Sequence, residues 1–239
     1  MARIDLTELI TAEYADERRL DVRFRTFREY HSDPRPETEV LDIVASFKPG
    51  TVLEVGCGGG AFSESVAKLT GAQVTAVDQS ARMAGLASLR GLNGVVADVQ
   101  SLPFPDRSFD LVIANWMLYH LPDLHRGLDQ LQRVLRPGGH LVAVTMASRM
   151  MGELWSQVHD DGSTPELTFS SENCAEELAC HFASVERRDL VGTATFPDYA
   201  AAISYMESTL TRAHLAPQLP RFEGPLEVST HNVVFIAER

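Results

Sequence analysis

The stretch VLEVGCGGG, residues 52–60, places an acidic residue near the end of a short apolar run and follows it with four glycines among five positions. A glycine-rich turn directly after a strand lets the backbone turn tightly and approach a ligand where a Cβ atom would clash. The helix expected to begin at Gly60 or Ala61 would present the positive end of its dipole to a carboxylate or phosphate. The stretch therefore predicts a site for a nucleotide-like cofactor.

The sequence around this turn alternates short apolar runs with helical segments. The predicted strands are TVLEV, QVTAVD, GVVAD, SFDLVIAN, HLVAVTM, ASVERRDL and HNVVFIAE. Short apolar runs separated by helices of about ten residues indicate a parallel sheet that is covered on both faces. The last two strands are expected to close one edge, where an antiparallel orientation is an option. The predicted fold class is α/β, with a doubly wound, mostly parallel seven-stranded sheet.

Two further segments stand apart from this alternation. Residues 1–35 are expected to form an N-terminal helical lid, because apolar and aromatic residues recur there at helical spacing until two prolines interrupt the pattern. Residues 36–239 then form the main domain. Within it, residues 146–170 lose the strand pattern, which predicts an insertion after the fifth strand, over the carboxyl ends of the strands.

Composition excludes several classes of protein. The 21 basic and 33 acidic residues give a net charge of −12, which repels a phosphate backbone, so no nucleic acid partner is expected. The three cysteines form no C-x-x-C pair and have no ligand spacing with histidine, so neither a disulfide framework nor a metal site is expected. No run of about 18 apolar residues occurs. These features predict a cytoplasmic protein without a membrane partner, either a monomer or a homodimer.

The glycines alone do not identify the cofactor, because GCGGGA also satisfies the dinucleotide-binding pattern G-x-G-x-x-A. Asp78 ends the second strand, where a ribose diol needs a hydrogen-bond acceptor in either kind of cofactor. Glu54, just before the turn, would repel a pyrophosphate but could help place an ammonium group. Asp98 follows the third strand, where it could accept a hydrogen bond from an adenine amino group. Asp78 therefore leaves the choice open, whereas Glu54, Asp98 and the proline-glycine turn in RVLRPGGHLV weigh against a dinucleotide.

Four stretches together resemble the class I S-adenosylmethionine-dependent methyltransferases, in particular their small-molecule branch of type 11/25. They are VLEVGCGGG, VTAVDQS, ADVQSLPFPDRSFDLVIANWMLYHLPD and RVLRPGGHLV, within about residues 40–145. The resemblance implies a Rossmann-like methyltransferase fold and S-adenosyl-L-methionine as the cofactor. It also implies methyl transfer to an oxygen or nitrogen of a small-molecule acceptor, such as a specialised metabolite, by in-line displacement in a closed cleft.

The resemblance also implies a set of cofactor-binding residues. These are Glu54, Gly56, Cys57 and Gly58 for the methionine part, Asp78 for the ribose hydroxyls, Gln79, Met83, Asp98 and Val99 for the adenine, and Asn115 near the sulfonium. Simpler interpretations stand beside several of these roles. Cys57 suits an inert buried thiol, Asp98 could simply start a turn, and Gly60 could only allow close packing.

Acceptor-side residues are harder to identify, because in-line displacement mainly requires alignment of the acceptor, and a catalytic base is optional. His120, just past the fourth strand, is the first candidate base, with Tyr119 as a second; His120 could equally pack the loop. Candidate substrate-contacting residues are Tyr14, Phe27, Tyr30, His31, Trp116 and Trp155. The aromatic residues among them could instead form the stripe that docks the N-terminal helix.

Two other functions compete with small-molecule methylation. An RNA or protein methyltransferase is disfavoured by the acidic balance and because Asn115 is not followed by the Pro-Pro-Tyr pattern. A non-catalytic S-adenosylmethionine-binding protein would have its cleft closed by Trp116 or by residues 146–170.

Overall fold

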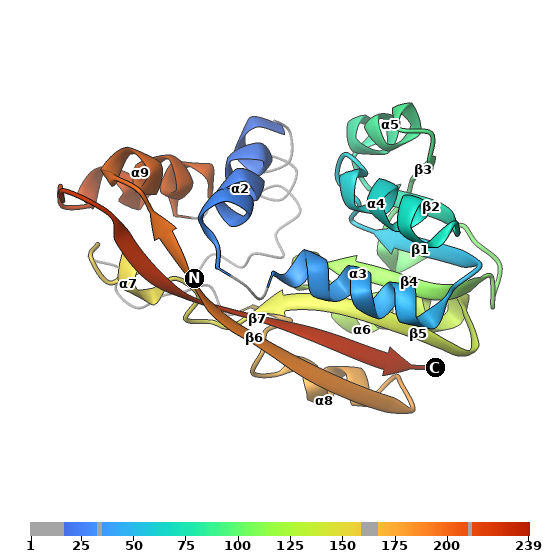
Figure 1. Cartoon of the computed structure of the whole chain (residues 1–239). Coiled ribbons are helices and arrows are strands. Elements are labelled where there is room, and N and C mark those ends of the chain that lie inside the picture. The colour runs from blue at the N-terminus through green and yellow to red at the C-terminus, as the bar shows by residue number, and fades with distance from the viewer. Residues whose placement is uncertain (1–16, 33–34, 159–166, 210–211) are drawn as a thin grey trace.

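The computed structural model describes residues 17–32, 35–158, 167–209 and 212–239. Its seven strands form one sheet in the order β3-β2-β1-β4-β5-β7-β6 (Figure 1). In chain order the strands are β1 Thr51–Val55, β2 Gln73–Asp78, β3 Asn93–Val96, β4 Phe109–Asn115, β5 Leu135–Met146, β6 Ser184–Phe196 and β7 Leu226–Glu238. Strands β1 to β5 pair in parallel, whereas β7 is antiparallel to β5 and to β6. The predicted doubly wound, mostly parallel sheet is confirmed, with the last two strands antiparallel at one edge.

Helices cover both faces of this sheet (Figure 1). The described helices are α2 Glu17–Tyr30, α3 Pro36–Phe47, α4 Ala61–Thr70, α5 Ala81–Leu89, α6 Leu124–Val134, α7 Gly152–Trp155, α8 Cys174–Ala179 and α9 Tyr199–Ser208, with 3₁₀ turns η1 Val99–Ser101, η2 Leu118–His120 and η3 Ala213–Gln218. Ile43 of α3 and Val66 of α4 pack on one face. Leu131 of α6 and Leu178 of α8 pack on the other. Because both faces are buried, the central strands are continuously apolar.

A third apolar cluster lies beyond the first residues of α3, on the side where α2 and α9 lie side by side (Figure 1). In this cluster α9 and α7 pack against the last residues of β6 and the first residues of β7. Phe27 and Tyr30 of α2 pack against the cluster as well. This cluster contains part of the predicted lid, residues 1–35, and part of the predicted insertion, residues 146–170. Residues 1–16 and 159–166 of those segments lie outside the described residues.

Strands β6 and β7 are longer than the apolar patterns predicted, with 13 residues each. The two strands pair along their whole length, from Ser184 with Glu238 to Phe196 with Leu226. The polar half of each strand is therefore stabilised by main-chain hydrogen bonds to the other strand. Alternation of apolar side chains in the sequence does not predict this pairing. Strand β5 likewise begins at Leu135, before the Pro-Gly-Gly turn, with an irregularity in its pairing with β4.

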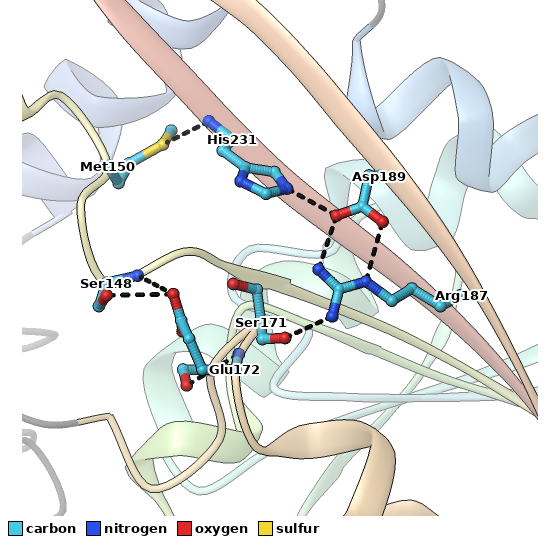
Figure 2. Close-up of polar contacts among 8 residues, drawn as sticks. Ser148, Met150, Ser171, Glu172, Arg187, Asp189 and His231 are labelled. Carbon is cyan, nitrogen blue, oxygen red and sulfur yellow. Dashed lines mark hydrogen bonds and ion pairs between the residues drawn. The ribbon is translucent and has the colours of Figure 1, made fainter.

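Polar contacts hold the chain after β5 against the β6-β7 hairpin (Figure 2). Arg187 donates to both oxygens of Asp189, at 2.8 and 2.7 Å, and to the Ser171 carbonyl oxygen at 2.6 Å. The His231 ring nitrogen Nε2 lies 2.6 Å from Asp189 on the neighbouring strand. The Arg187 guanidinium lowers the pKa of Asp189 to about 2. These bonds fix the segment that leads into α8 onto one face of the hairpin.

Gly60 gives the first testable prediction about packing. Its φ is 77°, and a Cβ added there would lie 2.8 Å from Ala87 Cβ and 2.9 Å from Ala87 Cα on α5. Gly71, at the other end of α4, has φ 72° but nothing within 4 Å of an added Cβ. Gly71→Ala should therefore lower the free energy of unfolding by about 1 kcal/mol, and Gly60→Ala by about 1–3 kcal/mol more.

Urea denaturation of the two variants beside the unchanged protein measures this difference. Equal losses in both variants would contradict a packing role for Gly60, because the left-handed backbone conformation is common to both positions.

Candidate cofactor and acceptor site

The end of β2 holds the glycine turn through main-chain and side-chain bonds. The Cys57 amide donates to the Val77 carbonyl oxygen at 3.0 Å, and the Gly58 amide donates to Asp78 Oδ2 at 3.0 Å. The other carboxylate oxygen of Asp78 accepts the Ser80 amide at 2.9 Å. Burial raises the pKa of Asp78, while both amide bonds act in the opposite direction. Asp78 is thus fixed beside the turn, and its remaining lone pairs can accept other donors.

Gly56 has φ 67°, and the residue nearest to its missing side chain is Met117, which follows β4. A Cβ added at Gly56 would lie 2.8 Å from Met117 Cβ and 2.9 Å from its Cγ. The atoms that leave no room for a side chain at Gly56 therefore belong to Met117 of the protein itself. Gly60 meets Ala87 in the same way, which supports the packing interpretation for that residue.

Glu54 is the most strongly perturbed of the predicted site residues. It is 3% exposed, and the Ser63 hydroxyl of α4 and the Asn115 side chain both donate to its carboxyl group. Burial raises its pKa to about 8, and the nearby Asp78 adds to the shift. Asn115 Oδ1 is buried and has no hydrogen-bond partner in the part of the chain that the structure describes. Two buried acceptors side by side suit an ammonium group, which brings three donors and a positive charge.

The predicted adenine residues gather around the end of β3. Asp98 is exposed and accepts the Gln100 amide at 2.8 Å, so it caps η1 as the turn interpretation predicted. Val99 and Met83 are buried at 6% and 1% exposure, whereas Gln79 is exposed. The ends of β1, β2, β3 and β4 meet at one edge of the sheet, which is where ligands bind in open α/β sheets.

The candidate base His120 lies in η2 directly after β4, with its ring centroid 4.5 Å from that of Tyr119. Tyr119 is 7% exposed and belongs to the core on the α6 face. Its carbonyl oxygen accepts the Thr168 hydroxyl at 3.1 Å. The packing interpretation therefore fits Tyr119, while His120, at intermediate burial, stays a candidate.

The structure brings three of the predicted substrate residues together. Phe27 stacks on Trp116, with ring centroids 6.4 Å apart and planes at 24°, and the Phe27 and His31 rings are 5.7 Å apart. Trp116 has φ 49° and donates from Nε1 to Asn232 Oδ1 of β7 at 3.1 Å. Tyr30 packs on Phe196 instead.

Trp155, another of the predicted substrate residues, packs against α9. The Trp155 ring centroid lies 6.3 Å from that of Tyr205, and the Arg212 guanidinium sits 4.5 Å above the Trp155 ring. Trp155 also lines a surface cavity of about 570 Å³ with Glu153 and Ser229. Ser229 lies on the opposite face of β7 from Asn232. Tyr14 lies outside the described residues.

Four residues near the site were not found from the sequence. Ser63 and Met117 touch predicted residues but carry no motif of their own. Thr230 and Asn232 are buried on β7, and their signal is present in LEVSTHNVVFIAE, where they interrupt an alternating row of valines. That alternation could have marked both residues as inward-facing polar groups.

Two kinds of feature are absent from the described residues. No described helix has the length and apolar character needed to span a bilayer. Within the same residues, no three histidine, cysteine or acidic side chains are grouped in a way that could hold a metal ion.

Comparison with known proteins places the predicted cofactor residues in a known domain. Residues 53–143 match the family model of the methyltransferase domain, and this span includes every predicted cofactor-binding residue. The chain is 34% identical over 136 residues to malonyl-[acyl-carrier protein] O-methyltransferase of Pseudescherichia vulneris, covering 54% of each protein. It is 37% identical over 164 residues to Methyltransferase GfsG of Streptomyces halstedii, covering 64% of this chain and 55% of that protein. The chain thus spans about half the length of these relatives.

A solved structure extends the likeness to the whole fold. This structure is that of 1,6-didemethyltoxoflavin-N1-methyltransferase of Burkholderia thailandensis with bound 1,6-didemethyltoxoflavin and S-adenosylhomocysteine. It has a TM-score of 0.61 at 21% identity, and the match covers 100% of this chain and 91% of that one. The sheet order, the glycine turn, the acidic strand ends and the matched family model agree. Residues 53–143 of this chain therefore match a methyltransferase domain, within a fold that resembles the class I S-adenosylmethionine-dependent methyltransferases.

Proposed function

We propose that this protein transfers a methyl group from S-adenosyl-L-methionine to an oxygen or nitrogen atom of a small-molecule acceptor, such as a specialised metabolite. The observation that carries the proposal is the buried acceptor pair of Glu54 and Asn115 at the same sheet edge as Asp78. When bound, the cofactor supplies an activated methyl group on a sulfonium.

The residues of the chain then have to bind, orient and exclude water. Glu54 and Asn115 would receive the ammonium group, and the fixed carboxylate of Asp78 would accept the ribose hydroxyls. Asp98 and Val99 would meet the adenine. Alignment of the acceptor with the methyl carbon can lower the barrier by roughly 7–11 kcal/mol. A neutral amine acceptor needs no base, because its nitrogen already carries a free lone pair.

Charge and the relatives support the proposed acceptor class. The net charge of −12 disfavours an RNA substrate. The curated relative is named an O-methyltransferase and the solved neighbour an N1-methyltransferase, so either atom is compatible with this fold. Residues 1–35 and 146–170 would form the acceptor side, as lid and insertion, of a cytoplasmic monomer or homodimer.

Calorimetry with S-adenosylmethionine, S-adenosylhomocysteine and NAD tests the cofactor, and only the first two are expected to bind. Incubation with methyl-labelled S-adenosylmethionine and a small-molecule extract of the source cells should then yield a labelled product, identified by mass spectrometry. Binding of NAD alone would overturn the proposal.

His120→Ala tests the candidate base on that product. If His120 takes a proton from the acceptor, turnover should fall about 100- to 10,000-fold while the affinity for S-adenosylmethionine stays unchanged. Single-turnover rates and calorimetry separate the two effects. Unchanged turnover would remove His120 from the mechanism and leave it a packing role.

A further inference from the structure

Strand β7 carries an inward-facing row that is interrupted by two polar residues. Because side chains alternate along a strand, Val228, Thr230, Asn232, Val234 and Ile236 share one face, and all of them are buried. Val228 belongs to the apolar cluster around α9 and α7, and Val234 to the cluster under α3. Thr230 and Asn232 lie between the two clusters, where apolar side chains would complete the row.

Each of these two residues has one polar side-chain atom that the fold does not use. Thr230 Oγ1 and Asn232 Nδ2 are buried and have no hydrogen-bond partner within the described part of the chain. Trp116 Nε1 donates to Asn232 Oδ1, which fixes the amide so that Nδ2 remains a donor. Leaving buried polar atoms unpaired is costly, and such violations of folding rules occur at functional sites.

His31 supplies a third buried, unpaired atom, on the other side of β6 from β7. It pairs with Ala194 at the outer edge of β6 and is 6% exposed. His31 Nδ1 lies 2.8 Å from the Ser32 carbonyl oxygen, which can only accept, so Nδ1 carries the proton. In the neutral form of this tautomer Nε2 is an acceptor, and it is buried without a partner in the described residues.

These groups border the proposed methyl donor site. Asn115 donates to Glu54, Trp116 follows Asn115 directly, and Trp116 bonds Asn232. Phe27 contacts both Trp116 and His31 from the side of α2. The unpaired atoms of β7 and His31 thus lie on either side of the Phe27–Trp116 pair, beside the residues assigned to the sulfonium end of the cofactor.

We infer that Thr230, Asn232 and His31 bind hydroxyl groups of the acceptor. A hydroxyl beside Thr230 and Asn232 can accept from Asn232 Nδ2 and pair with the Thr230 hydroxyl, and a second hydroxyl can donate to His31 Nε2. The neighbouring side chains, which include Phe27 and Met146, are mainly apolar. The acceptor is therefore a hydroxylated, largely apolar small molecule, and the three residues position it. This inference rests on the proposed function.

Thr230→Val tests the unpaired hydroxyl without any acceptor. The matched control is Thr145→Val, because Thr145 is equally buried on β5 but donates to the Phe169 carbonyl oxygen at 2.7 Å. Thr145→Val should lower the melting temperature by about 2–8 °C, whereas Thr230→Val should leave it unchanged or raise it. Equal losses would show that Thr230 is a structural residue and would overturn the inference.

Methyl transfer tests the recognition itself, with methyl-labelled S-adenosylmethionine and the extract of the source cells as the probe. Thr230→Val and His31→Asn should raise KM for the labelled acceptor about tenfold or more, with unchanged affinity for S-adenosylmethionine. Asparagine at position 31 can still donate to the Ser32 carbonyl but lacks Nε2.

The outcomes separate the two hypotheses. If the unchanged protein fails to bind S-adenosylmethionine, the proposed function is wrong. If it forms product and both variants keep its KM, only the inference about the acceptor is wrong. If it binds the cofactor but yields no labelled product, the melting-temperature comparison decides.

Discussion

Asp78→Ala is expected to weaken the binding of S-adenosylmethionine about 100- to 1,000-fold. A hydrogen bond to a charged group contributes about 1.5–3 kcal/mol, and a carboxylate at the end of β2 can accept from two ribose hydroxyls. The Asp78 carboxylate is held for this role by the Gly58 and Ser80 amides. Its removal also frees the Gly58 amide and loosens the glycine turn.

Calorimetric titration with S-adenosylmethionine and S-adenosylhomocysteine measures the effect. Asp42→Ala, on the exposed side of α3, is the matched control and should bind like the unchanged protein. Thermal unfolding of both variants checks that they are folded. An unchanged dissociation constant for Asp78→Ala would remove Asp78 from the ribose site.

Glu54 is expected to make the protein less stable as the pH rises from about 4.5 to about 8. The carboxyl group loses its proton near pH 4.5 in the unfolded chain but only near pH 8 in the folded one. Between these values the unfolded state binds fewer protons, so the free energy of unfolding falls with rising pH. The slope approaches about 1.4 kcal/mol per pH unit, for a total of up to about 5 kcal/mol, and the effect levels off above pH 8.

Urea unfolding at several pH values, for the unchanged protein and for Glu54→Gln, isolates this contribution. The glutamine amide does not titrate, so the difference between the two proteins should grow with pH. Glu176→Gln, on the exposed surface of α8, is the control and should follow the unchanged protein. Parallel curves for Glu54→Gln and the unchanged protein would contradict the buried, protonated carboxyl group.

The same residue predicts proton release on cofactor binding. An ammonium group placed beside Glu54 lowers the pKa of the carboxyl group, so binding near pH 7 should release up to one proton. Calorimetry in buffers of different ionisation enthalpy measures that proton. Release should disappear in Glu54→Gln, and equal release from both proteins would place the ammonium group elsewhere.

Local sequence patterns predicted the sheet well and placed the candidate cofactor residues at one edge of it. Apolar runs between helices identified all seven strands, and the acidic residues at successive strand ends marked one edge of a parallel sheet. The element ends were less predictable. Strands β6 and β7 extend through polar residues because each is paired with the other, which alternation in one strand does not reveal.

Side-chain neighbours from distant parts of the chain could not be predicted. Ser63 and Met117 touch Glu54 and Gly56 without any motif of their own. The pKa of Glu54 is likewise a product of burial by surrounding elements, since an isolated glutamate before a glycine turn titrates normally.

The sequence by itself placed the candidate cofactor residues at one sheet edge, because residues 52–115 put them at the ends of parallel strands, and such ends meet at one edge. Only the tertiary structure placed the candidate acceptor residues. Asn232 reaches Trp116 through the antiparallel register of β5 and β7, and His31 is held at the edge of β6 by its pairing with Ala194. A register shift of one residue would turn Thr230 and Asn232 to the other face, so their role depends on pairing and not on local sequence.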